Sequence, residues 1–190
     1  LSKRNDDPAG ASRPFDATRA GFARFWNAEA GCCVDVLDTP DGSADTSVRP
    51  NQLFAVALPA SPLTPEQQRA VVDVCARRLA TSYGVRTLAP GHVDYHGSAA
   101  GDVAARDGAY HQGTAWAWLL GVFALAHLRA HGDREAALSI LDPIAQHLAD
   151  AGLGSVSELF DGDAPHAPGG CPFQAWSVGE VLRAYAALAG

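Results

Sequence analysis

Apolar residues recur at spacings of three to four along much of the chain, as in helices that bury one face. The pattern predicts six helices, with at most a short strand at residues 33–37 between the first two. The predicted helices cover residues 15–29, 51–58, 65–83, 114–131, 134–150 and 174–188. Residues 1–14 are polar, contain two prolines and are expected to form a flexible arm. The pattern therefore predicts an all-α protein.

Several predicted helix ends carry residues that favour them. Thr64 is a good N-cap, Pro65 suits the first helical position, and Gln67 completes a capping box. Gly132 ends the fourth helix, and Asp133 caps the next one at once. These signals fix where two helices begin and where one ends.

The helix predicted over residues 114–131 differs from the others because apolar residues cover nearly its whole circumference. Such a helix is usually buried on every side. The helix over residues 134–150 is amphipathic, with its apolar residues on one face. His127, His131 and His147 are expected on helix surfaces.

The connections between the helices alternate in length. Residues 30–49, 81–113 and 151–173 are long connections, whereas 59–63 and 132–133 are short. Short connections make antiparallel neighbours, so we expect all three long connections at one end of the helical array. That end is the natural place for a site. A helix missed within residues 81–113 would break this alternation.

Composition excludes several classes of function. The net charge of −7 and the pI near 5.4 argue against a nucleic-acid partner. No apolar run reaches the ~18 residues that a membrane span needs. The N-terminal segment has no apolar core and the cysteines form no CxxC pair, so we expect a cytoplasmic protein with reduced thiols. The histidines are scattered, and we predict no metal site and no cofactor.

The segment from Gly152 to Trp176 is the most informative long connection. It is too long for a simple connector, and Phe160, Phe173 and Trp176 can anchor it. Glu158 and a second carboxylate at position 161 lie near its centre. A catalytic or sugar-binding loop and a solvated acidic loop both fit this pattern.

The other long connections bring further candidates to the same end. His111 and Gln112 lie at the mouth of the buried helix, where polar side chains need partners or ligands. Trp116 and Trp118 cannot share a face of that helix, and Trp116 is the better site candidate. The aspartates of the first long connection are expected to be turn or solvated residues, and Arg49 could pair with one of them. These are Asp35, Asp38, Asp41 and Asp45.

Four motifs, in order, resemble the C-terminal part of the glycogen debranching enzyme family, more narrowly the amylo-α-1,6-glucosidase domain of bacterial members. They read RPNQLFAVALP, GVRTLAPG, RDGAYHQGTAWAWLLG and GSVSELFDGDAPHAPGGCPFQAWSVGEVLRAY. The resemblance covers roughly residues 20–188. It implies an (α/α)₆ toroid, an α-glucan substrate such as glycogen or limit dextrin, and inverting hydrolysis of α-1,6-linked glucose by two carboxylates.

The resemblance also implies roles for particular residues. The glutamate of SELFDG, Glu158, matches the family's general base. An inverting base activates water across a gap of ~6.5–9.5 Å from the acid. The residues implied to contact sugar are Tyr110, His111, Gln112, Trp116 and Trp176, and Asp161 is implied to shape the loop or bind sugar.

The chain departs from the family pattern in two respects. The family's general acid follows a Thr-Trp motif, and no such segment occurs here. Six helices are also half of a twelve-helix toroid. We therefore expect residues 15–190 to be the C-terminal half of the domain, inactive without its N-terminal part. A glucoamylase-like or trehalase-like hydrolase and a non-catalytic carbohydrate-binding module remain alternatives.

Overall fold

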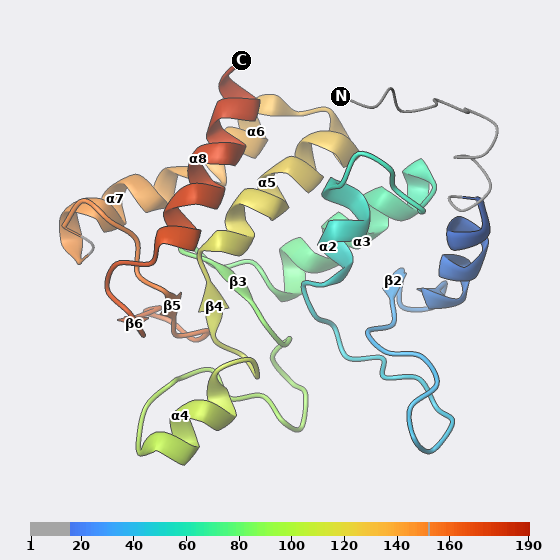
Figure 1. The fold of residues 1–190 in the computed structure, drawn as a ribbon, viewed down its shortest axis with the longest axis horizontal. Coiled ribbons are helices and arrows are strands. Elements are labelled where there is room, and N and C mark those ends of the chain that lie inside the picture. The colour runs from blue at the N-terminus through green and yellow to red at the C-terminus, as the bar shows by residue number, and fades with distance from the viewer. Residues whose placement is uncertain (1–15, 152) are drawn as a thin grey trace, which may run out of the picture.

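The computed structural model describes residues 16–151 and 153–190. The expected arm at residues 1–14 and the first position of the first helix lie outside the described residues. Helices predominate (Figure 1). After a helix over residues 16–22 come η1 (Ala23–Phe25), α2 (Gln52–Ala57), α3 (Pro65–Arg78), α4 (Val103–Ala109), α5 (Trp118–His131), α6 (Arg134–Ser139), α7 (Asp142–Asp150) and α8 (Ala175–Ala189).

The predicted helix starts are confirmed where the sequence carries caps. The Thr64 hydroxyl accepts a hydrogen bond from the Gln67 N–H (3.3 Å), and the Gln67 side chain accepts one from the Thr64 N–H (3.0 Å). Gly132 ends α5 in the left-handed conformation, and the Asp133 side chain caps α6. In each case a side chain or a positive φ satisfies the end of a helix locally.

The first predicted helix is too long, because a short 3-10 helix and a hairpin replace its second half. Strand β1 (Trp26–Asn27) pairs antiparallel with β2 (Cys32–Cys33). The Asn27 side chain accepts hydrogen bonds from the N–H groups of Glu29 and Ala30, both at 3.1 Å. This Asx-type turn offers the backbone an alternative to helix. The predicted strand near Cys33 is therefore present, but it is shorter than expected.

Three other helix predictions need correction. The helix predicted over 65–83 ends at Arg78, and Ala80 instead forms a β-bridge with Val85. The helix predicted over 134–150 is divided into α6 and α7, because Pro143 lacks an N–H and stands in the first turn of α7. The helix predicted from Thr114 begins only at Trp118, because residues 115 and 116 form strand β4 (Ala115–Trp116). Residues 115 and 116 are extended rather than helical because they pair with β3 on one side and with β5 on the other.

A four-stranded antiparallel sheet corrects the all-α prediction. Its order is β3 (Val85–Arg86), β4, β5 (Leu159–Phe160) and β6 (Pro168–Gly169). In the central pair Trp116 lies opposite Leu159. Each strand has only two residues, too few to produce an alternating sequence pattern. The sheet joins the two ends of the second long connection, at β3 and β4, to the third long connection, which contains β5 and β6.

The three long connections lie at one end of the helices, at the bottom of Figure 1, which we call the loop end. Helix α4 within residues 81–113 was missed, yet the alternation survives. The reason is that β3 and β4 are antiparallel neighbours, so the chain between them, including α4, begins and ends beside the same sheet and lies at the loop end. The expected meeting of long connections is confirmed.

Helix α5 forms the centre of the core and packs against α8, α2, α3 and α6 (Figure 1). Its side chains are buried along most of its length, as its apolar circumference predicts. Gly121 permits close packing with α8, because a Cβ at this position would lie 2.6 Å from the Glu180 carbonyl oxygen. Among the described residues, no helix has the length and apolarity to cross a membrane.

Replacement of Gly121 tests this packing. We expect Gly121→Ala to lower the free energy of unfolding by roughly 1–3 kcal/mol, because the added methyl group forces α5 and α8 apart. The matched control is Gly179→Ala in α8, where a Cβ meets nothing within 4 Å. It should raise the free energy by up to ~1 kcal/mol through helix propensity. Urea unfolding of both variants measures the difference, and equal effects would contradict the close α5–α8 contact.

Candidate active site

Glu158 lies at the loop end, directly before β5. Its backbone N–H donates to the Cys171 carbonyl oxygen at 2.9 Å, which closes the long connection into a narrow loop. The pairing of β5 with β4 places Leu159 opposite Trp116, so Glu158 lies one residue beyond this pair, beside the start of α5. The position of this carboxylate is therefore set by strand register.

Three donors from different segments hold the Glu158 carboxylate. Oε2 accepts a hydrogen bond from the Cys171 N–H at 2.9 Å. Oε1 accepts bonds from the Gln174 side-chain amide at 3.2 Å and from the Tyr110 hydroxyl. Hydrogen bonds to a charged group contribute about 1.5–3 kcal/mol each. The carboxylate is half-buried and has acceptor capacity for about one further donor, such as a water molecule.

Gly170 makes the Cys171 contact possible. Its φ is +68°, and a Cβ at this position would lie 2.4 Å from Glu158 Oε2. A side chain here would be strained in its own backbone and would collide with the carboxylate. The glycine therefore allows the loop to turn its N–H group toward Glu158.

Tyr110 is a neutral donor to Glu158. Burial, with the hydrogen bond to and the negative charge of Glu158, raises the pKa of Tyr110 to about 12. The hydroxyl therefore keeps its proton across the neutral range. It donates a hydrogen bond to Glu158 without adding a charge to the site.

Tyr110, His111 and Trp116 form a compact aromatic cluster beside this donor. The rings of His111 and Trp116 stack with centroids 5.1 Å apart, and the Tyr110 ring meets both edge-on. The Trp116 indole is buried and donates its N–H to the Tyr110 carbonyl oxygen at 3.1 Å. Trp116 thus supports the cluster from below, while His111 is the exposed ring on top of it.

Arg49 connects the cluster to the first long connection. Its Nη2 donates to Gln112 Oε1 at 2.7 Å, and its Nη1 donates to the His111 carbonyl oxygen at 2.9 Å. Its Nε lies 3.7 Å from Asp35 Oδ2. The side of the His111 ring that packs on Trp116 is shielded from water, and this partial desolvation and, secondly, the charge of Arg49 lower the pKa of His111. A neutral imidazole is therefore favoured beside Glu158.

Trp176 belongs to a second aromatic group at the start of α8. Its ring stacks on that of Trp118 with centroids 4.4 Å apart, and Trp118 in turn meets Phe54 at 5.8 Å. Trp176 is 56% exposed. Gln174, two residues earlier, donates to Glu158, so this exposed indole face and the carboxylate lie at the same end of one helix.

Asp161 follows β5 and takes part in the loop through its backbone. Its N–H donates to the Ala167 carbonyl oxygen at 2.8 Å, and its carbonyl oxygen lies 3.0 Å from His166 Nδ1. Its side chain is half-buried. These contacts give Asp161 a part in shaping the loop.

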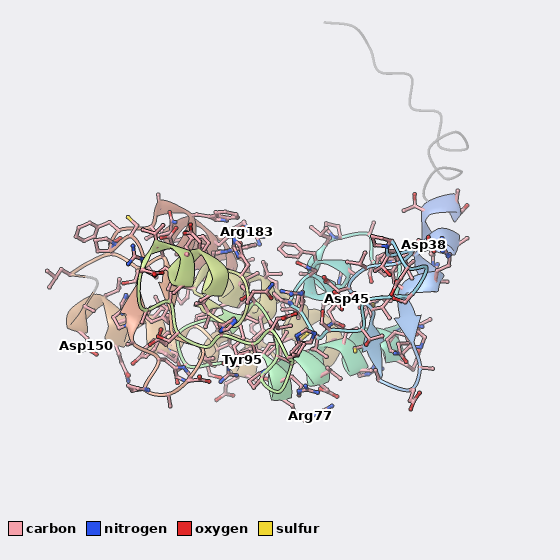
Figure 2. All side chains as sticks on the ribbon, turned by 90° about the horizontal axis from the view of Figure 1, so that it is seen from below. Asp38, Asp45, Arg77, Tyr95, Asp150 and Arg183 are labelled. Atoms are coloured by element: carbon pink, nitrogen blue, oxygen red, sulfur yellow. The ribbon has the colours of Figure 1, made fainter. Side chains whose placement is uncertain are left out.

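Figure 2 views the loop end directly and shows how its acidic residues are distributed. Asp38 and Asp45 lie in the first long connection, to one side of the view, whereas Tyr95 lies nearer the middle. The Tyr95 hydroxyl donates to Asp163 at 2.8 Å and so joins the second and third connections. Asp38 is exposed and pairs with Arg24 at 2.8 Å, away from Glu158.

The prediction that His147 is a helix-surface residue is wrong. His147 is only 3% exposed, and its Nε2 accepts a hydrogen bond from the Ser157 N–H at 3.1 Å. Its ring meets the Phe160 ring edge-on. It therefore anchors the loop immediately before Glu158. Helical spacing could not reveal this partner, because residues 154–157 fold back over α7.

The sequence also left the partners of Glu158 unassigned. The Cys171 N–H is a backbone group, and Gln174 carries no pattern that distinguishes it from a solvated residue. Arg49 was expected to pair with an aspartate of its own connection, and its ion pair with Asp35 confirms this. Its contacts with residues 111 and 112 were not predicted from the sequence and are seen only in the structure.

Glycoside hydrolases use a pair of carboxyl groups, and Glu158, held among aromatic rings and planar hydrogen-bonding groups, could be one of such a pair. Comparison with known protein families agrees: residues 14–183 match the family described as amylo-alpha-1,6-glucosidase. The chain therefore belongs to the amylo-alpha-1,6-glucosidase family, a family of glycoside-hydrolase type.

The His147 anchor predicts a pH-dependent stability. Burial lowers the pKa of His147 below the 6.5 of a free imidazole, so the folded state favours the neutral ring. The contribution of His147 to the free energy of unfolding is therefore complete above pH ~6.5. It is lost as the pH falls from ~6.5 to the lower pKa of the folded state, by at most ~1.4 kcal/mol per pH unit. Protonation also removes the acceptor for the Ser157 N–H.

The measurement is the free energy of unfolding between pH 7.5 and pH 5. We expect His147→Gln to be less stable than the parent at pH 7.5 and to have a shallower pH dependence. His96→Gln, which changes an exposed histidine, is the matched control and should keep the parent's slope. Because burial also lowers the pKa of His111 and His127, some slope should persist in every variant.

Proposed function

We propose that this chain forms part of a glycoside hydrolase that releases glucose from α-1,6 branch points of glycogen or limit dextrin. Membership of the amylo-alpha-1,6-glucosidase family supports the reaction class. The observation that carries the proposal within the site is the Glu158 carboxylate, fixed by three donors at the loop end.

In this proposal Glu158 is the general base of an inverting reaction. It takes a proton from a water molecule that attacks the anomeric carbon, while a second carboxyl group protonates the departing glycosidic oxygen. Its three donors hold the carboxylate in a fixed position for this role. Because Tyr110 keeps its proton and His111 favours its neutral form, neither adds a formal charge beside the base.

The general acid in this proposal comes from a segment outside residues 1–190. The chain contains no Thr-Trp-x-Asp segment. We propose that this segment belongs to the N-terminal part of an (α/α)₆ toroid, which would face the loop end described here. The two carboxyl groups would then lie ~6.5–9.5 Å apart, with room for the attacking water.

The remaining site residues would bind the sugar. The exposed faces of His111 and Trp176 can stack on the apolar face of a pyranose ring. Gln112 and Asp161 offer amide and carboxylate groups to hydroxyls. Trp116 is buried beneath His111, so its contribution in this proposal is to hold that ring in place.

Replacement of the base tests the reaction. In a protein that joins this chain to a segment carrying the Thr-Trp-x-Asp motif, Glu158→Gln should lower kcat for glucose release from limit dextrin by roughly 10²–10⁴-fold, the usual contribution of general base catalysis. Glu135→Gln, at an exposed position in α6, should leave kcat unchanged. NMR of the first product should show the β-anomer of glucose.

Three outcomes would contradict this assignment. Full activity of Glu158→Gln would remove the residue from the reaction. A product of retained α-configuration would exclude the inverting mechanism. Saturable oligosaccharide binding without turnover, unaffected by Glu158→Gln, would favour a non-catalytic carbohydrate-binding module.

Trp176 allows a separate test of sugar contact. In the same joined protein, Trp176→Ala should raise KM for limit dextrin roughly tenfold, because stacking on an aromatic face contributes on the order of 1–1.5 kcal/mol. The control Leu182→Ala removes an equally exposed apolar side chain from α8 and should leave KM unchanged. Equal effects of the two variants would mean that α8 acts only through packing.

A further inference from the structure

A second cavity lies beside the first long connection, separate from the Glu158 carboxylate. Its volume is about 350 Å³, within the range of small-molecule sites. The wall consists largely of apolar side chains from residues 16–25, α2 and the connection after α2. Three of these are the aromatic residues Phe22, Phe25 and Phe54. The first two stack on each other with centroids 5.1 Å apart.

The polar groups of this cavity come mainly from the first long connection and the start of α2. Asp35 Oδ1 accepts a hydrogen bond from the Asn51 side-chain amide at 2.7 Å, and Asp35 Oδ2 faces Arg49 Nε at 3.7 Å. The side chains of Asp35 and Arg49 are only 13% and 18% exposed. A carboxylate has about four acceptor positions, so Asp35 retains capacity for a ligand's hydroxyl groups.

Two sets of contacts connect this cavity with the Glu158 site. Arg49 lines the cavity, and its Nη groups donate to the Gln112 side chain and the His111 carbonyl oxygen. Phe54 also lines the cavity. Its ring contacts Trp118, and Trp118 stacks on Trp176. A polar path and an aromatic path therefore run between the two places.

We propose that this cavity is an accessory subsite that receives a glucosyl unit of the main glucan chain while the branch glucose lies at Glu158. The inference rests on the proposed function, because it assumes an α-glucan substrate. A pyranose presents an apolar face and a rim of hydroxyl groups. The phenylalanine rings of the cavity can pack against the apolar face, and its carboxylate, guanidinium and amide groups can form hydrogen bonds with the hydroxyl groups.

The proposal predicts a dependence on chain length. The full chain should bind maltotriose about tenfold more tightly than glucose, because glucose is too short to occupy both places. Asp35→Asn and Phe22→Leu should each weaken maltotriose binding severalfold to tenfold and leave glucose binding unchanged. Phe22→Leu keeps an apolar side chain, so it tests the aromatic face rather than the packing.

Isothermal titration calorimetry with glucose and maltotriose measures these affinities. The matched control is Asp41→Asn, which changes an exposed aspartate of the same connection that bonds Thr39 and Ser43 and does not line the cavity. It should bind both sugars as the parent does. NMR provides the location, because maltotriose should shift the side-chain amide signals of Asn51.

The outcomes separate this inference from the proposed function. If glucose release requires Glu158 but maltotriose binds no more tightly than glucose and Asp35→Asn has no effect, the subsite is overturned and the hydrolase assignment stands. If glucose release does not require Glu158 while maltotriose affinity still depends on Asp35 and Phe22, the cavity is a glucan site and the hydrolase assignment fails.

Discussion

The pairing of β4 with β5 is the constraint on which the candidate site depends. It joins two connections that are distant in sequence and sets Trp116 opposite Leu159. Because side chains alternate along a strand, a shift of one residue would turn the neighbouring side chains to the other face. The contact between Tyr110 and Glu158 therefore requires this register. The helices form most of the core and bring the long connections to one end, and the small sheet fixes the positions of the site residues there.

The site achieves its electrostatic character with few formal charges. Glu158 is held by a phenol, an amide and a backbone N–H, none of which carries a charge. The nearby cation, Arg49, is directed at Gln112 and at the His111 carbonyl oxygen, and it also faces Asp35. Arg49 thereby orders the aromatic cluster and joins it to the second cavity.

Local sequence signals predicted much of the helical frame. The capping box at Thr64, the left-handed Gly132 and the apolar circumference of α5 each depend on neighbours within a few residues. The alternation of connection lengths then predicted a common loop end, which the structure confirms. Glu158 was singled out by the loop that carries it and by the family resemblance, and the match over residues 14–183 confirms that family.

The sequence by itself determined where most of the helices lie, the caps of α3 and α6, and the end at which the long connections meet, because these follow from short-range periodicity and end signals. Tertiary structure alone decided the two-residue strands, the burial of His147 and the donors to Glu158. The partners of His147 and Glu158 lie 10 to 48 residues away in sequence. Two-residue strands and backbone donors leave no periodic pattern in sequence, so only the folded chain shows which groups meet.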